Sequence, residues 1–470
     1  MDRAARGAVL GRPDAPHALT MSVSTTAPGA RAAYDGGPLP ASSAEGARGR
    51  DVGSWILAVA AFGVVALRQT DILPFVPLGL SPARFVLVVG ACLWVLTRLF
   101  GQRSPYRLGA LGAMLALYAL ALLSAYATQM TRPTNAPSLD ALLVVDLLMI
   151  LVVPFVVTVI HDVAGLVRVI KGLVAGGVVS ALLALQQNVA GSGTAVHVRL
   201  PGLVDGAGIP FTIDDVFRGG MVRAQGGASH PLELACVLTM LFPLALALAL
   251  SMRAAGRRWW PWAVASAVIV AGIAVTLARS GVIGLLVGLA VLAAYWPIRR
   301  TLAALAALAA TITLAVLLDV PFLGSYLTIF TADSSVEQRA AVTSALPFDI
   351  TPFGMYARVT GTPSPGVDVP TLDDQYLKAL SETGVFGVTA YVALIGTATV
   401  LAYRAFARAR NRSRTGATDP RAQLFLGVAA ALAAYAVVSI FLDTAGFLQI
   451  WTLMWLLIAM AAVTRRLSAS

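Results

Sequence analysis

Lysine, histidine and cysteine are scarce in this chain of 470 residues, which has two lysines among 34 basic residues, four histidines and two cysteines. Both cysteines, Cys92 and Cys236, lie inside apolar runs. The sequence therefore implies neither a disulfide framework nor a thiolate metal site. We expect no metal and no cofactor.

The first 50 residues lack the apolar core of a signal peptide. They are rich in Gly, Ala, Pro and Ser and carry several arginines. This composition predicts a disordered, basic cytoplasmic tail over residues 1–50. Met1 and Met21 both remain open as the translation start.

Acidic residues are fewer than basic ones, and the net charge is +11. This excess does not indicate nucleic-acid binding, because the basic residues stand in short segments between apolar runs. Such a distribution is typical of the signals that set membrane topology.

Long apolar runs are what the chain has in abundance, and 58% of its residues are hydrophobic. Many runs reach the roughly 20 residues that a helix needs to cross ~30 Å of hydrocarbon. They are continuous rather than alternating, which favours helices over a β-barrel. The sequence predicts an all-α polytopic membrane protein whose transmembrane domain covers residues 51–464. About twelve spans are expected, in a range of ten to twelve, at 53–68, 83–100, 108–127, 139–160, 164–190, 231–251, 260–277, 280–297, 301–318, 376–403, 422–441 and 445–464.

The basic residues also predict an orientation. With the N-terminus inside, cytoplasmic segments hold 24 of the 34 basic residues, as the positive-inside rule favours. Both termini, including the short tail 465–470, are then cytoplasmic, and we expect the chain in the cell's inner membrane. Two long segments, 191–230 and 319–375, become extracytoplasmic loops.

The larger of these loops has signals of ordered structure. Ser334 stands three residues before Glu337, which is the spacing of a capping box. A short helix is expected from there to about residue 346, and it would carry Arg339. The segment 361–370 is typical of an extended or mobile lid.

Arg279 stands in an otherwise apolar stretch, where its charge costs at least a few kcal/mol if it is buried in the bilayer. As one helix, residues 259–298 would be about 60 Å long, roughly twice the bilayer. Two short helices are therefore predicted, with residues 279–281 as the turn between them at the outer face. Gly281 suits such a turn.

Three arginines from separate segments then face outside: Arg223, Arg279 and Arg339. Guanidinium groups pair bidentately with phosphate oxygens, so a diphosphate site is one interpretation. The alternatives are an Arg279 that reaches to the membrane interface and ordinary solvated arginines at the other two positions.

Residues 223–235, RAQGGASHPLELA, combine turn and helix-start signals. The glycine pair 226–227 permits a tight turn, and Ser229 is a suitable cap for the next helix. His230 is better explained as structural than as catalytic because it stands at a helix start. Glu233 falls in the first turn, where a carboxylate suits the helix dipole.

Residues 373–387, DDQYLKALSETGVFG, open the tenth expected span. Asp373 and Asp374 are either helix caps or a carboxylate that deprotonates an acceptor hydroxyl. Lys378 and Glu382 stand four residues apart, where opposite charges pair on one helix face.

Four segments resemble, in the right order, motifs of the O-antigen ligase and polymerase superfamily of bacterial membrane glycosyltransferases. RAQGGASHPLELA is similar to R-x-x-G…(N/H)-P-x-x-L-A. TLARSGVIGLL is similar to the turn T-x-S-R-G-x-x-x-x-L, with Ala278 for the usual Ser and Ser280 before the Gly. SSVEQR and DITPFGMYARV resemble S-x-x-x-R and P-(hydrophobic)-x-G-x-G, although only Gly354 is present. DDQYLKALSETGVFG is similar to (H/D)-N-x-Y-L-x-x-x-x-E-x-G-x-x-G. The segments span 223–387, about a third of the chain.

The resemblance implies a GT-C-like fold and a metal-independent, inverting glycan transfer outside the cell. The donor would be a glycan on undecaprenyl diphosphate, and the acceptor a glycan or lipid-linked glycan. Arg223, Arg279 and Arg339 would hold the diphosphate leaving group. Asp373 and Asp374 would be catalytic. Asp373 stands in place of the histidine found in ligases, so a lipopolysaccharide ligase is the less favoured function within this superfamily. Supporting residues would be His230, Glu233, Tyr376 and Glu382.

Other membrane functions remain as alternatives. A secondary transporter also has about twelve helices, but it usually shows related halves, and the chain has no half-to-half repeat. Asp146 is the clearest acid inside a predicted span, either as a packing hydrogen-bonder or as part of a cavity. A lipid-linked-glycan flippase and a peptidoglycan strand polymerase are further candidates. The sequence does not separate polymerase from ligase.

Overall fold

The computed structural model describes residues 41–76, 78–101, 108–131, 136–190, 200–205, 217–218, 221–299, 301–302, 351–354, 356, 373–412 and 419–469. Contacts divide the chain into residues 1–45 and 46–470. Only residues 41–45 of the first unit are described, as the start of a helix. The following account concerns the second unit.

The described residues form eleven helices and four very short strands. The helices are α1 (Ala41–Ala66), α2 (Pro82–Leu99), α3 (Ala110–Met130), α4 (Ala136–Val159), α5 (Val163–Ala190), α6 (Pro231–Ala254), α7 (Trp260–Val275), α8 (Arg279–Ala293), α12 (Gln375–Arg412), α13 (Pro420–Val438) and α14 (Leu448–Ala469). The strands form two antiparallel pairs, β1 (Asp71–Ile72) with β2 (Val204–Asp205) and β3 (Phe217–Arg218) with β4 (Met221–Val222).

The helices confirm an all-helical, multi-pass membrane architecture. Among the described residues, eight helices are long and apolar enough to cross a bilayer. Three more apolar helices are shorter, over Val52–Ala66, Trp260–Val275 and Arg279–Ala293. Eleven of the twelve predicted spans coincide with these helices. The remaining span, 301–318, lies outside the described residues except for its first two.

The predicted division of 259–298 into two short helices is confirmed by α7 and α8. The turn itself lies earlier than predicted, at residues 276–278, because α8 already begins at Arg279. Leu277 takes the left-handed conformation there, with φ 52°. Gly281 instead lies in the first turn of α8, where a Cβ would come within 3.1 Å of the Ala235 side chain. Its small size serves helix packing, not the turn.

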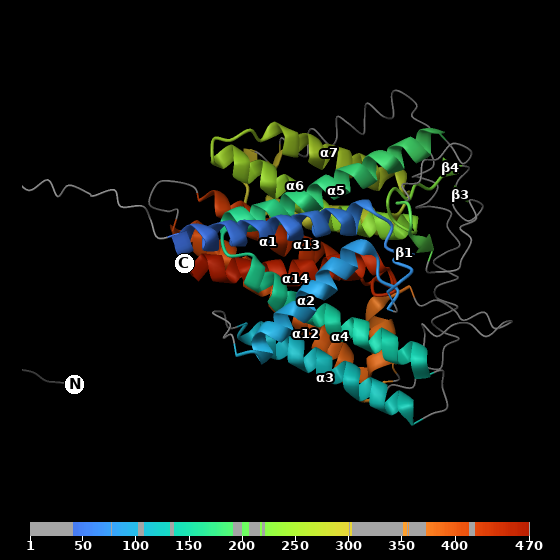
Figure 1. Ribbon diagram of the computed structural model, residues 1–470. Coiled ribbons are helices and arrows are strands. Elements are labelled where there is room, and N and C mark those ends of the chain that lie inside the picture. Colours follow the sequence, from blue (N-terminus) through green and yellow to red (C-terminus); the bar gives the residue numbers. More distant parts are fainter. Residues whose placement is uncertain are drawn as a thin grey trace, which may run out of the picture. The chain divides into compact units, whose positions relative to one another are not determined.

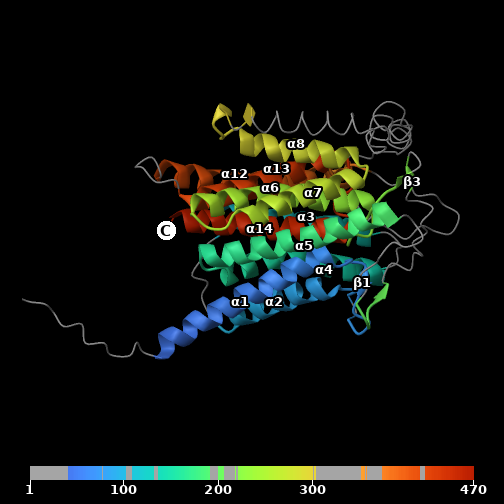
Figure 2. The same cartoon turned by 90° about the horizontal axis from the view of Figure 1, so that it is seen from above.

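The core of the bundle lies around α6, α13 and α14 (Figures 1 and 2). In α6 and α14, 89% of the residues in the most apolar stretch are buried, against 28% in α2 and 33% in α3. A helix that is apolar on all sides is stable only where other helices surround it or where lipid covers it. Here α6 and α14 are surrounded by protein, and α2 and α3 lie at the periphery.

The bundle has two different ends. The strands lie at one end, which we call the strand end (Figure 1, right). The chain's C-terminus lies at the other, which we call the basic end because α14 finishes there with Arg465 and Arg466. Arg408 and Arg412 of α12 line the same small cavity as these two arginines.

Candidate functional site

The segment before α6, residues 223–230, is packed inside the strand end instead of forming part of an exposed loop. Gln187 Oε1 of α5 accepts hydrogen bonds from two successive backbone N–H groups of this segment, at 3.0 and 2.8 Å. Ser180 Oγ accepts one from the next N–H group, at 2.8 Å. Buried irregular backbone in a membrane protein requires such partners. The last part of the predicted loop 191–230 is therefore packed against α5.

The glycine pair in this segment permits close contact with two helices. Gly226 has φ 57°, and a Cβ on it would lie 2.2 Å from the backbone oxygen of Ser180. A Cβ on Gly227 would lie 2.5 Å from the backbone oxygen of Ala66. The pair thus provides the predicted turn and also lets α1 and α5 approach the segment.

Arg223 reaches the turn between α7 and α8. Its Nε donates to the backbone oxygen of Thr276 at 3.2 Å, and the N–H of Ala224 donates to the oxygen of Val275 at 3.3 Å. A cation is favourable at these last carbonyls of α7. Arg279 follows Thr276 by three residues and is the first residue of α8. Two of the three predicted arginines therefore occupy one region, and both are partly buried.

This region is suited to an anion. Arg279 stands at the N-terminus of α8, where the helix dipole and the first N–H groups also favour negative charge. Arg223 adds a second guanidinium from a different segment. Arg339, the third predicted arginine, lies outside the described residues. The same is true of Ser334, Glu337 and the segment 361–370.

His230 and Glu233 hold the start of α6 in place. His230, not the predicted Ser229, is the helix cap: its Nδ1 accepts a backbone N–H two residues on, at 3.2 Å. Its ring stacks on Phe447, with 5.7 Å between centroids. Ser229 donates to Glu233 Oε2 through its N–H, at 2.9 Å, and through its hydroxyl. Glu233 Oε1 accepts the N–H of Gln449 at 3.0 Å, which joins α6 to α14.

Asp374 takes the helix-capping role that the sequence left open. Its Oδ1 accepts the N–H groups of Tyr376 and Leu377, at 2.8 and 3.1 Å. Partial burial raises the pKa of Asp374 above its usual value, and these two N–H groups offset the effect only in part. Asp373 is partly buried just before it. Tyr376 donates its hydroxyl to the oxygen of Ala436 at 2.8 Å, which joins α12 to α13.

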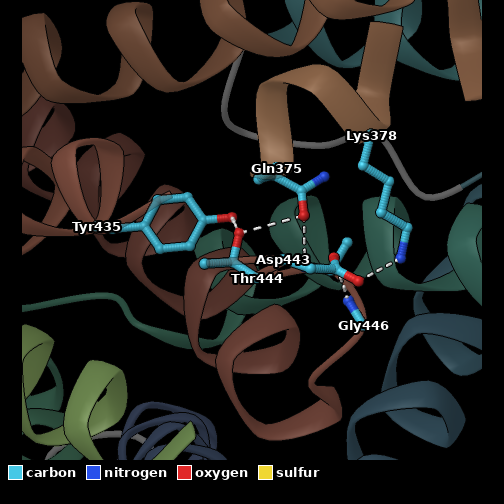
Figure 3. A network of polar contacts seen from close by, with 7 residues as sticks. Gln375, Lys378, Tyr435, Asp443, Thr444 and Gly446 are labelled. Carbon is cyan, nitrogen blue, oxygen red and sulfur yellow. Dashed lines mark hydrogen bonds and ion pairs between the residues drawn. The ribbon is translucent and has the colours of Figure 1, made fainter. Parts of the chain in front are cut away.

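The start of α12 also binds the loop between α13 and α14 (Figure 3). Gln375 Oε1 accepts the N–H of Ala445 at 2.6 Å and the hydroxyl of Thr444 at 3.4 Å. The hydroxyls of Thr444 and Tyr435 are 3.0 Å apart. This network was not predicted, because a glutamine at the mouth of a span gives no sign of its partner.

Lys378 forms a buried ion pair with Asp443 of that loop, with Nζ and Oδ2 2.6 Å apart (Figure 3). The Lys378 side chain is 2% exposed and that of Asp443 is 23% exposed. Asp443 also accepts the N–H of Gly446 at 2.9 Å. The predicted partner of Lys378, Glu382, lies close enough to interact with it electrostatically. Asp443 itself was missed, since it falls in a short loop with no motif.

A second charged group lies nearby. Tyr356 donates its hydroxyl to Asp146 of α4 at 2.7 Å, and Arg84 and Lys378 interact electrostatically with the same carboxylate. Arg84 is only 3% exposed at the start of α2. Asp146 thus has the hydrogen-bonding role that was one of its two predicted alternatives. Charged groups from α2, α4 and α12 thus lie close enough to interact here.

The third and fourth motif segments contact each other at a kink in α12. Gly354 and Gly384 both have positive φ, 66° and 68°, and Gly384 interrupts the helix. The oxygens of Thr351 and Pro352 accept the next two N–H groups of α12, at 3.1 and 3.0 Å. The segment 351–354 therefore supplies partners for backbone groups at the kink.

The end of α13 connects the two halves of this site. A Cβ on Gly284 of α8 would lie 2.5 Å from the side chain of Val438, the last residue of α13. The oxygen of the next residue, Ser439, accepts the N–H of Gln375 at 2.9 Å. One end of α13 thus contacts both α8, which carries Arg279, and the start of α12.

Comparison with known proteins gives no assignment. No protein-family model matches the chain, and no curated protein matches it significantly. Within the described parts of the chain, no group of three or more His, Cys, Asp or Glu side chains is placed to hold a metal ion.

Proposed function

We propose that the chain is a membrane glycosyltransferase that acts on a glycan carried by undecaprenyl diphosphate. The strand end would face the outside of the inner membrane, and both termini the cytoplasm. The observation that carries the proposal is the contact of Arg223 with the α7–α8 turn, three residues before Arg279. This contact brings residues more than fifty positions apart in the chain to one helix N-terminus, where positive charge would suit a diphosphate leaving group.

In this proposal the arginines neutralise charge that develops on the diphosphate as the glycosidic bond breaks. Arg339 would add to them, as the motif resemblance implies. Asp373 is the candidate for the base that takes the acceptor's proton, because the motif resemblance puts it at the position of the ligase histidine. Asp374 caps α12. Transfer would be inverting and independent of metal. His230, Glu233 and Tyr376 would support the site through the helix contacts described above.

The test uses cells that lack this chain. Lipid-linked glycans are extracted and sized by mass spectrometry, after complementation with wild type, Arg279→Ala or Arg404→Ala. Arg404 is an exposed arginine on α12 and serves as the matched control. Accumulation of single repeat units without active protein supports a polymerase, and accumulation of long unligated chains supports a ligase. An unchanged lipid pool in all strains would falsify the proposal.

A secondary transporter is the alternative with some structural support. The Lys378–Asp443 pair and the Arg84–Asp146 interaction place charged groups within or beside membrane helices, where they are costly and often functional. The same extraction separates the two functions, because a transporter of another solute leaves lipid-linked glycans unchanged.

A further inference from the structure

A cavity of about 820 Å³ lies away from the candidate site, among α1, α5, α6, α7 and the start of α13. Most of its wall is apolar, with Val59, Phe62 and Val167 among the lining residues. Its floor is formed where α1 and α5 touch: a Cβ on Gly172 would lie 2.2 Å from the backbone oxygen of Ala58. The backbones of α1 and α5 therefore meet directly on this side of the cavity.

The cavity also has a strongly basic rim. Arg168, Lys171, Arg257 and Arg421 line it, and its described lining includes no Asp or Glu. Arg421 has an acidic neighbour, Asp419, at 3.9 Å. The Arg168 guanidinium donates to Ser54 Oγ at 2.8 Å. The positive charge offered to a ligand therefore comes mainly from Lys171 and Arg257.

Two tryptophans fix the basic side chains at this level. The Arg168 guanidinium lies 5.7 Å from the ring centroid of Trp55, and the Lys171 ammonium lies 5.4 Å from that of Trp262. Tryptophan beside Arg or Lys is typical of the level of lipid headgroups. The rim thus corresponds to the membrane interface and the apolar wall to the acyl-chain region.

The cavity opens toward lipid. Trp55 and Val59 on α1 are 58% and 67% exposed, although they belong to an apolar helix. Apolar side chains so exposed on a membrane helix face acyl chains. A soluble anion would leave the apolar wall uncovered, whereas a phospholipid covers both parts.

We propose that this cavity is a binding site for an anionic phospholipid. The phosphate would contact Lys171 and Arg257, beside Arg168, and an acyl chain would lie along the apolar wall between α1 and α5. Basic pockets between membrane helices are suited to such headgroups. The proposal is independent of the enzymatic one, since no residue of the cavity belongs to the candidate site.

The test measures thermal unfolding of the purified full chain in detergent. Phosphatidylglycerol or cardiolipin is titrated, with phosphatidylcholine and inorganic phosphate as comparisons. Anionic lipid is expected to raise Tm, whereas the other two leave it unchanged. The double variant Lys171→Gln/Arg257→Gln is expected to bind anionic lipid about thirtyfold more weakly, as the loss of two basic side chains implies.

The control is Arg299→Gln/Arg404→Gln, which removes the same charge from exposed positions that do not line the cavity. It is expected to respond to lipid as wild type does. The proposal is overturned if the control loses as much affinity for anionic lipid as the double variant does. It is also overturned if phosphatidylcholine or inorganic phosphate raises Tm as much as anionic lipid does. If the double variant misfolds, native mass spectrometry of the wild type tests the proposal instead. Retention of zwitterionic lipid as readily as anionic lipid would overturn the proposal.

Discussion

Gly354 and Gly384 lie so close together that neither tolerates a side chain. A Cβ on Gly354 would stand 2.3 Å from the nitrogen of Gly384, and a Cβ on Gly384 would stand 2.5 Å from the nitrogen of Gly354. Because both residues also have positive φ, the contact depends on glycine for conformation as well as for space.

The first prediction concerns this contact. Gly384→Ala is expected to destabilise the protein by about 2 kcal/mol or more, through left-handed strain and overpacking. Thermal unfolding in detergent measures the effect. Gly396→Ala is the control, because nothing lies within 4 Å of a Cβ at that position of the same helix; it is expected to be neutral or slightly stabilising. Equal Tm values for the two variants would contradict the assigned packing.

The second prediction concerns the ion pair at the start of α12. Lys378→Met is expected to cost about 3 kcal/mol, because it leaves Asp443 with an unpaired, largely buried charge. Lys378→Met combined with Asp443→Leu is expected to recover much of that loss. Unfolding midpoints of the two single variants and the double variant give the coupling energy.

The other lysine of the chain provides the control for this cycle. Lys171→Met removes a cation–π contact with Trp262 and is expected to cost ~1 kcal/mol or less. Additive effects of the changes at 378 and 443 would show that the two residues do not depend on each other.

The third prediction separates the two arginines. Arg279→Ala is expected to lower transfer from a lipid-diphosphate donor by roughly 10²–10³-fold, which is typical of losing one preorganised charge-stabilising group. Arg223→Ala is expected to lower transfer and also stability, by about 1 kcal/mol, because its hydrogen bond to Thr276 is lost. Purified protein is assayed for both properties, with Arg404→Ala alongside. Wild-type transfer by Arg279→Ala excludes the diphosphate role.

The fourth prediction concerns the adjacent aspartates and pH. Asp373→Asn is expected to abolish transfer, whereas Asp374→Asn is expected to retain it, because asparagine caps a helix as well as aspartate does. Loss of transfer in both variants, or only in Asp374→Asn, would reverse the assignment of the base.

Asp374→Asn also tests the raised pKa. Since the pKa of Asp374 is higher in the folded protein, its contribution favours folding below pH 3.8 and is lost as pH rises through the folded pKa. Asparagine has no such dependence. The free energy of unfolding of Asp374→Asn relative to wild type is therefore expected to increase from pH 3.5 to pH 7. A difference between the two proteins that does not change with pH would count against the raised pKa of Asp374.

Much of the architecture could be predicted from the sequence, for a physical reason. Apolar runs of membrane length have few alternatives to helix, so the positions of eleven helices follow from hydropathy alone. The division of 259–298 into two helices followed from the rise per residue of a helix. The position of the turn between them could not be predicted, because Leu277 adopts a left-handed conformation that is usual for glycine.

The site was harder to predict because its partners are distant in sequence. Arg223 and Arg279 could be named as candidates, but their common region depends on a hydrogen bond to Thr276. Asp443 and Gln187 carry no motif. Gln187 did give a signal, as a polar residue near the end of an apolar span, where its side chain requires a buried partner.

The link between Glu233 and Gln449 has a consequence for how the protein is made. Gln449 lies in the first turn of α14, the last of the described helices, and yet that helix is among the most buried. The helices that precede α14 therefore cannot complete their packing until α14 lies between them. Until then Glu233 lacks one of its hydrogen-bond donors, so the start of α6 reaches its final arrangement only after α14 has been made.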